Sequence, residues 1–170
     1  MKQNVILIGF MGAGKTSVGE RLSKRTGKEL LDTDQLIEQE AGMSISDIFA
    51  KQGEVAFRRT ETKVLEQLLA ETDDAVISVG GGLPLLKQNR EMLKQLGTVA
   101  FLRVQRETVL KRLKGDTTRP LLQGDHVERK VEELLAYRNP IYEDAAHVVI
   151  DVDGKSLNAI VDEIQKHYGA

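Results

Sequence analysis

The chain has 170 residues, a formal net charge of −2, no cysteine and three histidines. A chain of this length forms one domain with a substantial core. A charge near zero gives no general attraction to nucleic acid or anionic membranes, and the lack of cysteine excludes disulfides and thiolate chemistry. The ten uncharged residues 3–12 faintly resemble a short signal peptide. Cleavage there would destroy the motif described next, which argues against a signal peptide. We therefore expect a soluble cytoplasmic protein.

A glycine-rich stretch at residues 9–16 reads Gly-Phe-Met-Gly-Ala-Gly-Lys-Thr and fits the phosphate-binding P-loop pattern. An apolar run at 5–8 precedes it and predicts a buried strand, and a helical pattern closed by Gly27 follows it. A chance glycine-rich turn would not need these neighbours. Backbone N–H groups and a helix N-terminus together hold phosphate oxygens. We predict that Lys15 contacts the β- and γ-phosphates and that Thr16 ligates Mg²⁺.

The rest of the chain alternates strand-like apolar runs with helical periodicity, which favours an α/β fold. Strands are predicted over 29–31, 75–79, 98–104 and 147–151. Helices are predicted around 36–41 and over 44–53, 54–71, 87–96, 107–114, 127–137 and 156–168. Val55, Val64, Leu65, Leu68 and Leu69 are expected to form the apolar side of the helix over 54–71. The whole chain, 1–170, is predicted to be one three-layer α/β/α sandwich with a five-stranded parallel sheet.

Asp32-Thr33-Asp34 and Gly80-Gly81-Gly82 each follow a predicted strand, as the P-loop does. Ligands of parallel sheets gather beyond the carboxyl ends of the strands, so these segments should meet in one cleft. We expect the side chains of Asp32 and Asp34 to diverge at the end of the strand, so that one can approach a Mg²⁺ shell and the other a hydroxyl that is to be phosphorylated. The equal alternative is that Asp34 caps the following helix.

Arg58 and Glu61 lie three residues apart on a predicted helix. Such a pair is most often an exposed salt bridge of small energetic weight. A cation near a helix N-terminus is unfavourable, however, which indicates a further partner for Arg58. The glycines at 80–82 exceed the single glycine that a turn requires, so we expect a small molecule to approach their backbone.

Taken together, the motifs of this chain resemble those of the shikimate kinases. They are the P-loop at 9–16, Asp-Thr-Asp at 32–34, Phe-Arg-Arg-Thr-Glu at 57–61, Gly-Gly-Gly at 80–82, Arg-Pro-Leu-Leu at 119–122 and Arg-Asn-Pro-Ile-Tyr at 138–142. The resemblance implies a fold of the P-loop kinase type and transfer of phosphate from ATP to the 3-hydroxyl of shikimate, a step of chorismate and aromatic amino-acid biosynthesis. It implies Mg²⁺ as cofactor and ATP and shikimate as partners. We also expect a monomer with no nucleic-acid or membrane partner.

The resemblance also assigns site residues. The expected catalytic residues are Lys15, Asp34 and Arg119. The expected ATP-binding residues are Gly12, Ala13, Gly14, Lys15, Thr16, Ser17, Arg112 and Arg119. The expected substrate-binding residues are Asp34, Arg58, Gly80, Gly81, Gly82 and Arg138, with the arginines on the carboxylate; the metal positions are Thr16 and, through water, Asp32. Candidates for contact with the adenine base lie around 151–154, where no residue-by-residue match exists.

Residues 115–125 are polar, flanked by glycines and without hydrophobic periodicity. They are expected to close over bound nucleotide as a mobile lid carrying Arg119, the alternative being an ordinary surface loop.

The substrate is expected to contact helices within 33–61.

Other classes of protein share the P-loop. The nearest alternative is a kinase for another small polyol, such as gluconate. The presence of Arg58, Gly81 and Arg138 together argues against it. A GTPase would carry the guanine-reading string Asn/Thr-Lys-x-Asp, which does not occur in the chain. A nucleic-acid translocase would need a second core and a basic channel.

Overall fold

The structure is a computed structural model and describes residues 2–113 and 126–168. One sheet of five parallel strands has the order β2-β3-β1-β4-β5. The strands are β1 (Asn4–Ile8), β2 (Glu29–Asp32), β3 (Ala75–Ser78), β4 (Gly97–Arg103) and β5 (Val148–Asp151). β1 is central and buried along its whole length, as its unbroken apolar run predicts. The predicted parallel sheet is confirmed.

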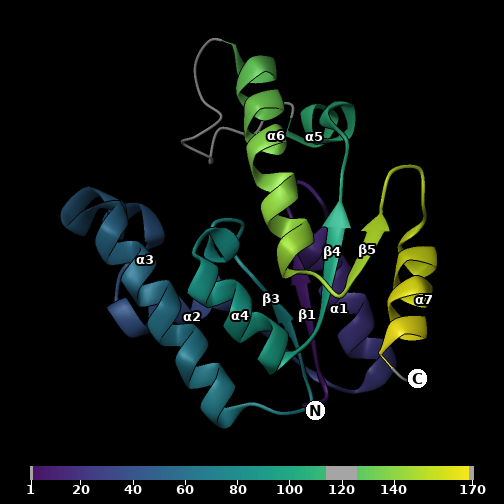
Figure 1. Ribbon diagram of the computed structural model, residues 1–170, viewed down its shortest axis with the longest axis horizontal. Helices are drawn as coiled ribbons and strands as arrows, with labels where there is room; N and C mark the ends of the chain where they lie inside the picture. The colour runs from purple at the N-terminus through teal and green to yellow at the C-terminus, as the bar shows by residue number, and fades with distance from the viewer. Residues whose placement is uncertain (1, 114–125, 169–170) are drawn as a thin grey trace.

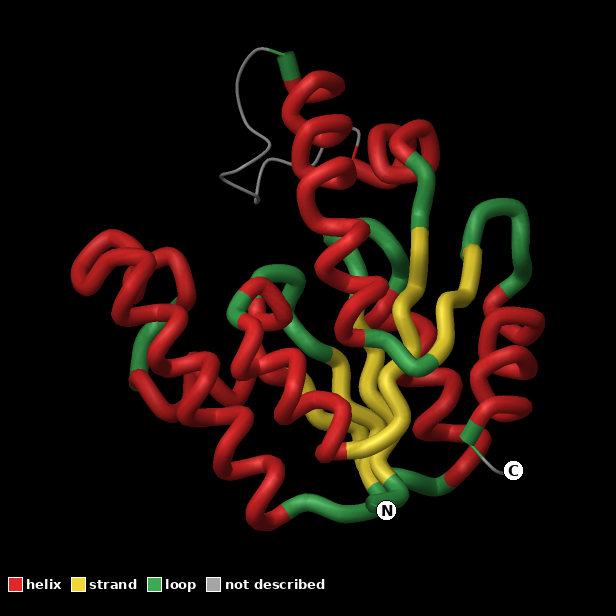
Figure 2. Tube along the Cα trace, in the orientation of Figure 1, coloured by secondary structure: helices red, strands yellow, loops and turns green. Residues whose placement is uncertain are grey.

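Helices cover both faces of the sheet (Figures 1 and 2). On one face α1 (Lys15–Thr26) packs against α7 (Leu157–His167). On the other lie α3 (Ile45–Glu71), α4 (Lys87–Leu96) and α6 (Val127–Ala145). The remaining elements are α2 (Thr33–Ala41), α5 (Arg106–Leu113) and the short 3₁₀ turn η1 (Leu83–Leu85). The arrangement is the predicted three-layer sandwich, and no helix in the described ranges is long and apolar enough to cross a membrane.

Several helix ends lie where local sequence rules put them. α1 and α2 end at Gly27 and Gly42, both in the left-handed conformation that glycine tolerates best. The Ser44 hydroxyl accepts a hydrogen bond from the backbone N–H of Asp47 and caps α3. α3 is interrupted at Gly53, whose φ of 85° is not helical, so the two helices predicted on either side of this residue meet at a kink.

Two sequence predictions about helices are wrong. Val55 is 68% exposed and does not belong to the apolar side of α3. It lies nine residues before the buried Val64, which at 100° per residue puts the two on opposite faces of the helix. α6 does not end near Tyr137 but continues through Pro140 to Ala145. Burial of its residues on both sides of the proline, Arg138 and Tyr142 among them, holds the helix together where local propensity favours a stop.

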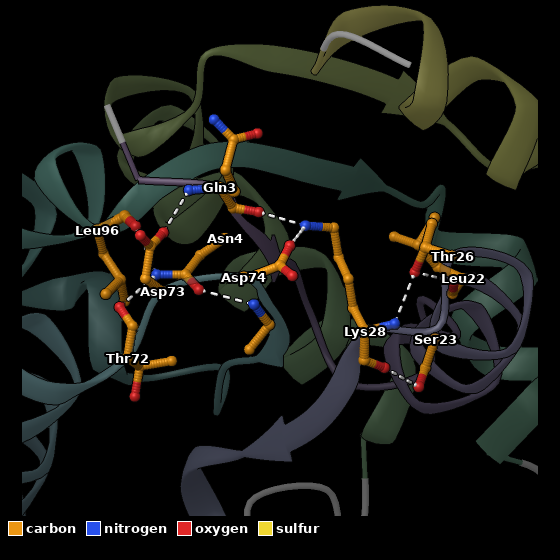
Figure 3. A network of polar contacts seen from close by, with 11 residues as sticks. Gln3, Asn4, Leu22, Ser23, Thr26, Lys28, Thr72, Asp73, Asp74 and Leu96 are labelled. Carbon is orange, nitrogen blue, oxygen red and sulfur yellow. Dashed lines mark hydrogen bonds and ion pairs between the residues drawn. The ribbon is translucent and has the colours of Figure 1, made fainter.

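At the amino ends of the strands, the buried side chain of Asn4 ties three segments together (Figure 3). Its amide nitrogen donates to the carbonyl oxygens of Thr72 at 3.0 Å and Leu96 at 2.9 Å, and its oxygen accepts from the N–H of Ala75 at 2.8 Å. Every polar atom of this buried amide therefore has a partner. These bonds fix the starts of β1 and β3 and the end of α4, at the opposite edge of the sheet from the cleft described next.

Candidate active site

A cleft of 870 Å³ opens at the carboxyl ends of the strands. Fourteen of the predicted site residues line it: Gly12, Ala13, Gly14, Lys15, Thr16, Ser17, Asp32, Asp34, Arg58, Gly80, Gly81, Gly82, Arg112 and Arg138. The predicted convergence of the three motif segments on one cleft is therefore found. Arg119 and the predicted lid over 115–125 lie outside the described residues.

The P-loop folds around the amino group of Lys15. Its Nζ donates to the carbonyl oxygens of Gly9 at 2.6 Å and Phe10 at 3.3 Å, which places the cation across the loop. Gly12 and Gly14 have φ of 84° and 93°, a conformation that side-chain-bearing residues rarely adopt. Because α1 begins at Lys15, its positive N-terminal end faces the same loop. The segment has the geometry of an anion-binding site.

Arg112 on α5 lies against the P-loop, with NH1 donating to the Gly12 carbonyl oxygen at 2.6 Å. The cleft is also lined by Lys155, Leu157 and Ile160, which sequence reasoning did not identify. The predicted adenine region at 151–154 is not part of the lining, although it comes directly before it. The available signal was Ser156, which caps α7 and marks where the chain turns back along the cleft.

The structure corrects the expected geometry of the two aspartates. Asp34 lies in the first turn of α2 and not in extended chain, because the helix starts one residue after β2 ends. The helix cap is Asp32, whose Oδ1 accepts from the N–H groups of Asp34 at 2.8 Å and Gln35 at 3.2 Å. The alternative that Asp34 serves as the cap is therefore wrong, and its carboxylate is left for the cleft.

The pKa of Asp34 is raised above its ordinary value, chiefly because burial disfavours the charged carboxylate and secondly because Asp32 lies close by. Lys15 and Arg58 oppose this rise without cancelling it. A carboxylate with a raised pKa takes up a proton more readily than an ordinary aspartate does.

Each glycine at 80–82 makes room for one charged side chain. A Cβ on Gly80 would lie 2.5 Å from the Oδ1 of Asp34, one on Gly81 would lie 3.3 Å from the NH1 of Arg138, and one on Gly82 would overlap the guanidinium of Arg58. None of the three has the positive φ that would itself require glycine. The three glycines are therefore explained by space for neighbouring side chains, a reason that the sequence did not reveal.

The ion pair between Arg58 and Glu61 is buried, so the expected exposed salt bridge is wrong. Arg58 NH1 lies 2.7 Å from Glu61 Oε1, and the two side chains are 17% and 1% exposed. Burial raises the pKa of Glu61 to about 7 although the adjacent Arg58 lowers it. The cation near the start of a helix thus has two carboxylate partners, Glu61 at the edge of the cleft and, at 3.8 Å, Glu54.

Arg138 projects from α6 beside Gly81 and is only 6% exposed. Its Nε is buried and has no hydrogen-bond partner, and within the described ranges no carboxylate lies close enough to form an ion pair with it. Its guanidinium lies 5.8 Å from the ring centroid of Phe10. The charge of Glu61 is felt at longer range only. A nearly buried cation that forms no ion pair with the described residues is suited to an anionic ligand.

A gluconokinase from Sinorhizobium meliloti shares the fold, with a TM-score of 0.57, but only 16% of aligned residues are identical over 97% of this chain and 90% of that one. This similarity shows a common architecture and carries no information on the substrate.

A family model described as shikimate kinase matches residues 11–168. A shikimate kinase of Symbiobacterium thermophilum is 43% identical over 96% of this chain and 94% of its own length, and one of Thermodesulfovibrio yellowstonii is 41% identical over 98% and 95%. The solved structure of the shikimate kinase from Acinetobacter baumannii in complex with shikimate matches with a TM-score of 0.89 and 41% identity, covering 96% of this chain and 90% of that one. With this match over almost its whole length, the chain belongs to the shikimate kinase family of phosphotransferases.

Proposed function

We propose that this cleft transfers the γ-phosphoryl group of ATP to the 3-hydroxyl of shikimate, giving shikimate 3-phosphate and ADP on the route to chorismate and the aromatic amino acids. The observation that carries the proposal is Arg138, a nearly buried cation whose Nε has no hydrogen-bond partner and which forms no ion pair among the described residues. A planar guanidinium binds a carboxylate through two parallel hydrogen bonds, and shikimate carries one carboxylate. The structure of the related shikimate kinase from Acinetobacter baumannii has been solved in complex with shikimate.

On the acceptor side, Arg58 and Arg138 bind the substrate carboxylate, and Asp34 receives the hydroxyl that is phosphorylated. The raised pKa of Asp34 supports a role in taking the hydroxyl proton as the phosphoryl group arrives. The glycines at 80–82 leave the space in which these three charged side chains lie around the substrate.

On the nucleotide side, the P-loop N–H groups and the N-terminus of α1 hold the phosphates, with Lys15 neutralising their charge. Arg112 stacks on the adenine base of the nucleotide, and Lys155 and Leu157 line the adjacent wall of the cleft. Phosphoryl transfer depends on positioning and charge neutralisation more than on covalent chemistry, and this set of groups supplies both. The role expected of Arg119, contact with the phosphates, stays a prediction.

The residues present suit Mg²⁺. This ion keeps several waters and takes one or two protein ligands together with substrate phosphates, so it needs no cluster of three acidic or histidine ligands, and the described residues contain none. Thr16 at the start of α1 and Asp32, whose capping bonds use only Oδ1, would hold it and its water shell. When bound, the ion offsets negative charge on the transferring phosphoryl group.

The test is ADP release measured with Mg·ATP and, in separate reactions, shikimate, quinate or gluconate. We expect turnover with shikimate far above that with gluconate and above the rate without acceptor. Equal turnover with gluconate would refute the proposed substrate. We also propose a monomeric cytoplasmic enzyme with neither nucleic-acid nor membrane partners, because its net charge of −2 gives no general attraction to either polyanion. Light scattering during turnover tests the monomer.

A further inference from the structure

Residues 80–83, the glycine loop, are held in place by three side chains with no exposed surface. These are Thr33, Asn89 and Tyr142. They come from three different helices, and each makes a hydrogen bond to the backbone of the glycine loop. None of them is among the residues assigned to substrate or nucleotide above.

The first contact joins the glycine loop to α2. The hydroxyl oxygen of Thr33 accepts a hydrogen bond from the N–H of Gly80 at 2.9 Å. Thr33 is the residue before Asp34, and the missing Cβ of Gly80 leaves the space that the Asp34 carboxylate occupies. One hydrogen bond therefore sets the distance between the glycine loop and the residue proposed to receive the acceptor hydroxyl.

The second contact joins the glycine loop to α6. The hydroxyl of Tyr142 donates to the carbonyl oxygen of Gly81 at 2.7 Å. Tyr142 lies one helical turn after Arg138, and its ring packs on Phe101 with centroids 5.2 Å apart. The tyrosine thus fixes the turn of α6 that presents Arg138 beside Gly81.

The third contact joins the glycine loop to α4 and α3. The amide nitrogen of Asn89 donates to the carbonyl oxygen of Leu83 at 2.9 Å, and its oxygen accepts from the hydroxyl of Thr62 at 2.9 Å. Thr62 lies one turn after Arg58 on α3. Asn89 therefore fixes the part of α3 that carries Arg58 against the end of the glycine loop, where Gly82 leaves room for the guanidinium.

We propose that Thr33, Asn89 and Tyr142 are positioning residues for the acceptor substrate. Each couples the glycine loop to the helix of one charged side chain: Thr33 to Asp34, Tyr142 to Arg138 and Asn89 to Arg58. This inference rests on the proposed function of those three charges. A buried, fully paired hydrogen-bond network holds such side chains rigidly, and errors of about 1 Å in their position lower phosphoryl-transfer rates strongly.

The inference predicts an effect on one substrate only. None of the three side chains forms a hydrogen bond to the P-loop at 9–16; among the described residues, the side-chain hydrogen bonds to its backbone come from Lys15 and Arg112. Loss of a hydrogen bond to the glycine loop should therefore weaken the binding of shikimate and leave the binding of ATP unchanged. A merely structural role would lower stability and raise both Michaelis constants together.

The first experiment compares Asn89→Ala with Asn4→Ala. Both asparagines are buried and bridge two or more segments, but Asn4 lies at the opposite edge of the sheet. Both variants should lower the melting temperature. Asn89→Ala should lower kcat/KM for shikimate about tenfold, the loss expected for one to two buried hydrogen bonds, with KM for ATP changed less than twofold. Asn4→Ala should leave kcat/KM for shikimate within twofold of wild type at 25 °C.

The second experiment uses conservative changes that keep the packing. Tyr142→Phe removes only the hydroxyl and Thr33→Val replaces it by a methyl group, and each should raise KM for shikimate several-fold while KM for ATP stays within twofold. Thr33→Ser keeps the hydroxyl and should restore most of the affinity. If Thr33→Ser raised KM for shikimate as much as Thr33→Val does, loss of the hydroxyl contact to Gly80 would not be the cause of the increase.

A double-variant cycle tests whether Asn89 acts through Arg58. In an Arg58→Ala background, Asn89→Ala should lower kcat/KM for shikimate less than twofold, because the side chain that it positions is gone. An undiminished tenfold loss in that background, or equal losses for shikimate and ATP in the single variants, would overturn the inference alone. A wild-type protein without shikimate turnover would overturn the proposed function and this inference with it.

Discussion

At the scale of single residues, the cations of the cleft differ in how their charge is balanced. Arg58 forms an ion pair with the buried Glu61, whereas Arg138 forms no ion pair within the described ranges and interacts with Glu61 only at longer range. Lys15 is held by two carbonyl oxygens of the P-loop. Burial makes an uncompensated charge costly, so the position of Arg138 is understandable when a ligand supplies the missing negative charge.

Lys15→Ala is expected to abolish phosphoryl transfer and to leave the fold intact. The amino group neutralises phosphate charge and is not part of the apolar core. ADP release measures the loss, and the circular dichroism spectrum and melting temperature check the fold. Turnover near that of wild type would contradict the phosphate-binding role of the loop.

Arg138→Lys is expected to weaken shikimate binding by about 1.5–3 kcal/mol, the range for charge-assisted hydrogen bonds, because lysine lacks the bidentate fork. Calorimetric titration with shikimate measures the change, and titration with ATP is the control that should barely move. The same substitution at Arg58 should act in the same direction. A shikimate analogue without the carboxylate should bind wild type and variants almost equally; a large remaining difference would contradict the assignment.

At the scale of elements, the positions of the charged side chains in the cleft depend on where helices begin and end and on the glycines that leave space for these side chains. α2 starts directly after β2, which turns Asp34 into the first helical turn beside Gly80. α6 continues through Pro140 and so carries Arg138 and Tyr142 on one buried face. The glycine loop at 80–83 then fits between these helices.

Gly82→Ala tests that fit. The φ of Gly82 is −93°, which alanine adopts without strain, so the backbone itself should tolerate the change. The added methyl group would overlap the guanidinium of Arg58 and displace it. We expect KM for shikimate to rise at least tenfold, the equivalent of about 1.4 kcal/mol, with little change in KM for ATP. Steady-state kinetics with each substrate varied in turn measures both, and unchanged shikimate kinetics would show that Arg58 does not need this space.

At the scale of the whole molecule, the sheet separates two kinds of polar network. Asn4 and its partners fix the amino ends of the strands and serve stability (Figure 3). At the carboxyl ends the buried charges Asp34, Arg58, Glu61 and Arg138 lie together, which reduces stability in exchange for a site able to bind charged substrates.

Glu61 makes the stability of the protein depend on pH. Its folded-state pKa of about 7 lies above its ordinary value of 4.5, so the folded state holds this proton more tightly than the unfolded state. The resulting stabilisation is complete below about pH 4.5 and is lost as the pH rises through 7. Asp34, whose pKa is also raised, contributes with the same sign.

Glu61→Gln should therefore flatten the decrease in unfolding free energy between pH 5 and about 7.5. Urea unfolding of wild type and variant at several pH values measures the two slopes, and subtracting them removes the contribution of the other groups. Equal slopes would show that Glu61 does not titrate in this range. Asp47→Asn is a control at an exposed carboxylate and should leave the slope unchanged.

The features that follow local rules could be predicted from the sequence alone. The apolar run at 5–8 predicted a buried strand, glycines at 27 and 42 ended helices, and the order of the motifs indicated the family and fourteen of the residues that line the cleft. Hydrophobic periodicity, helix capping and phosphate binding by a P-loop depend on residues close together in the chain, so they can be read from it.

The features that depend on distant neighbours could not be predicted from the sequence and became evident in the folded protein. Glu61 is buried because α3 packs against the rest of the fold, and the glycines at 80–82 are needed because Asp34, Arg138 and Arg58 arrive there from three helices. Pro140 stays inside α6 because buried contacts outweigh the local preference of proline. Burial and the space around a side chain are set by packing between segments far apart in sequence, and local patterns carry no record of which segments will meet.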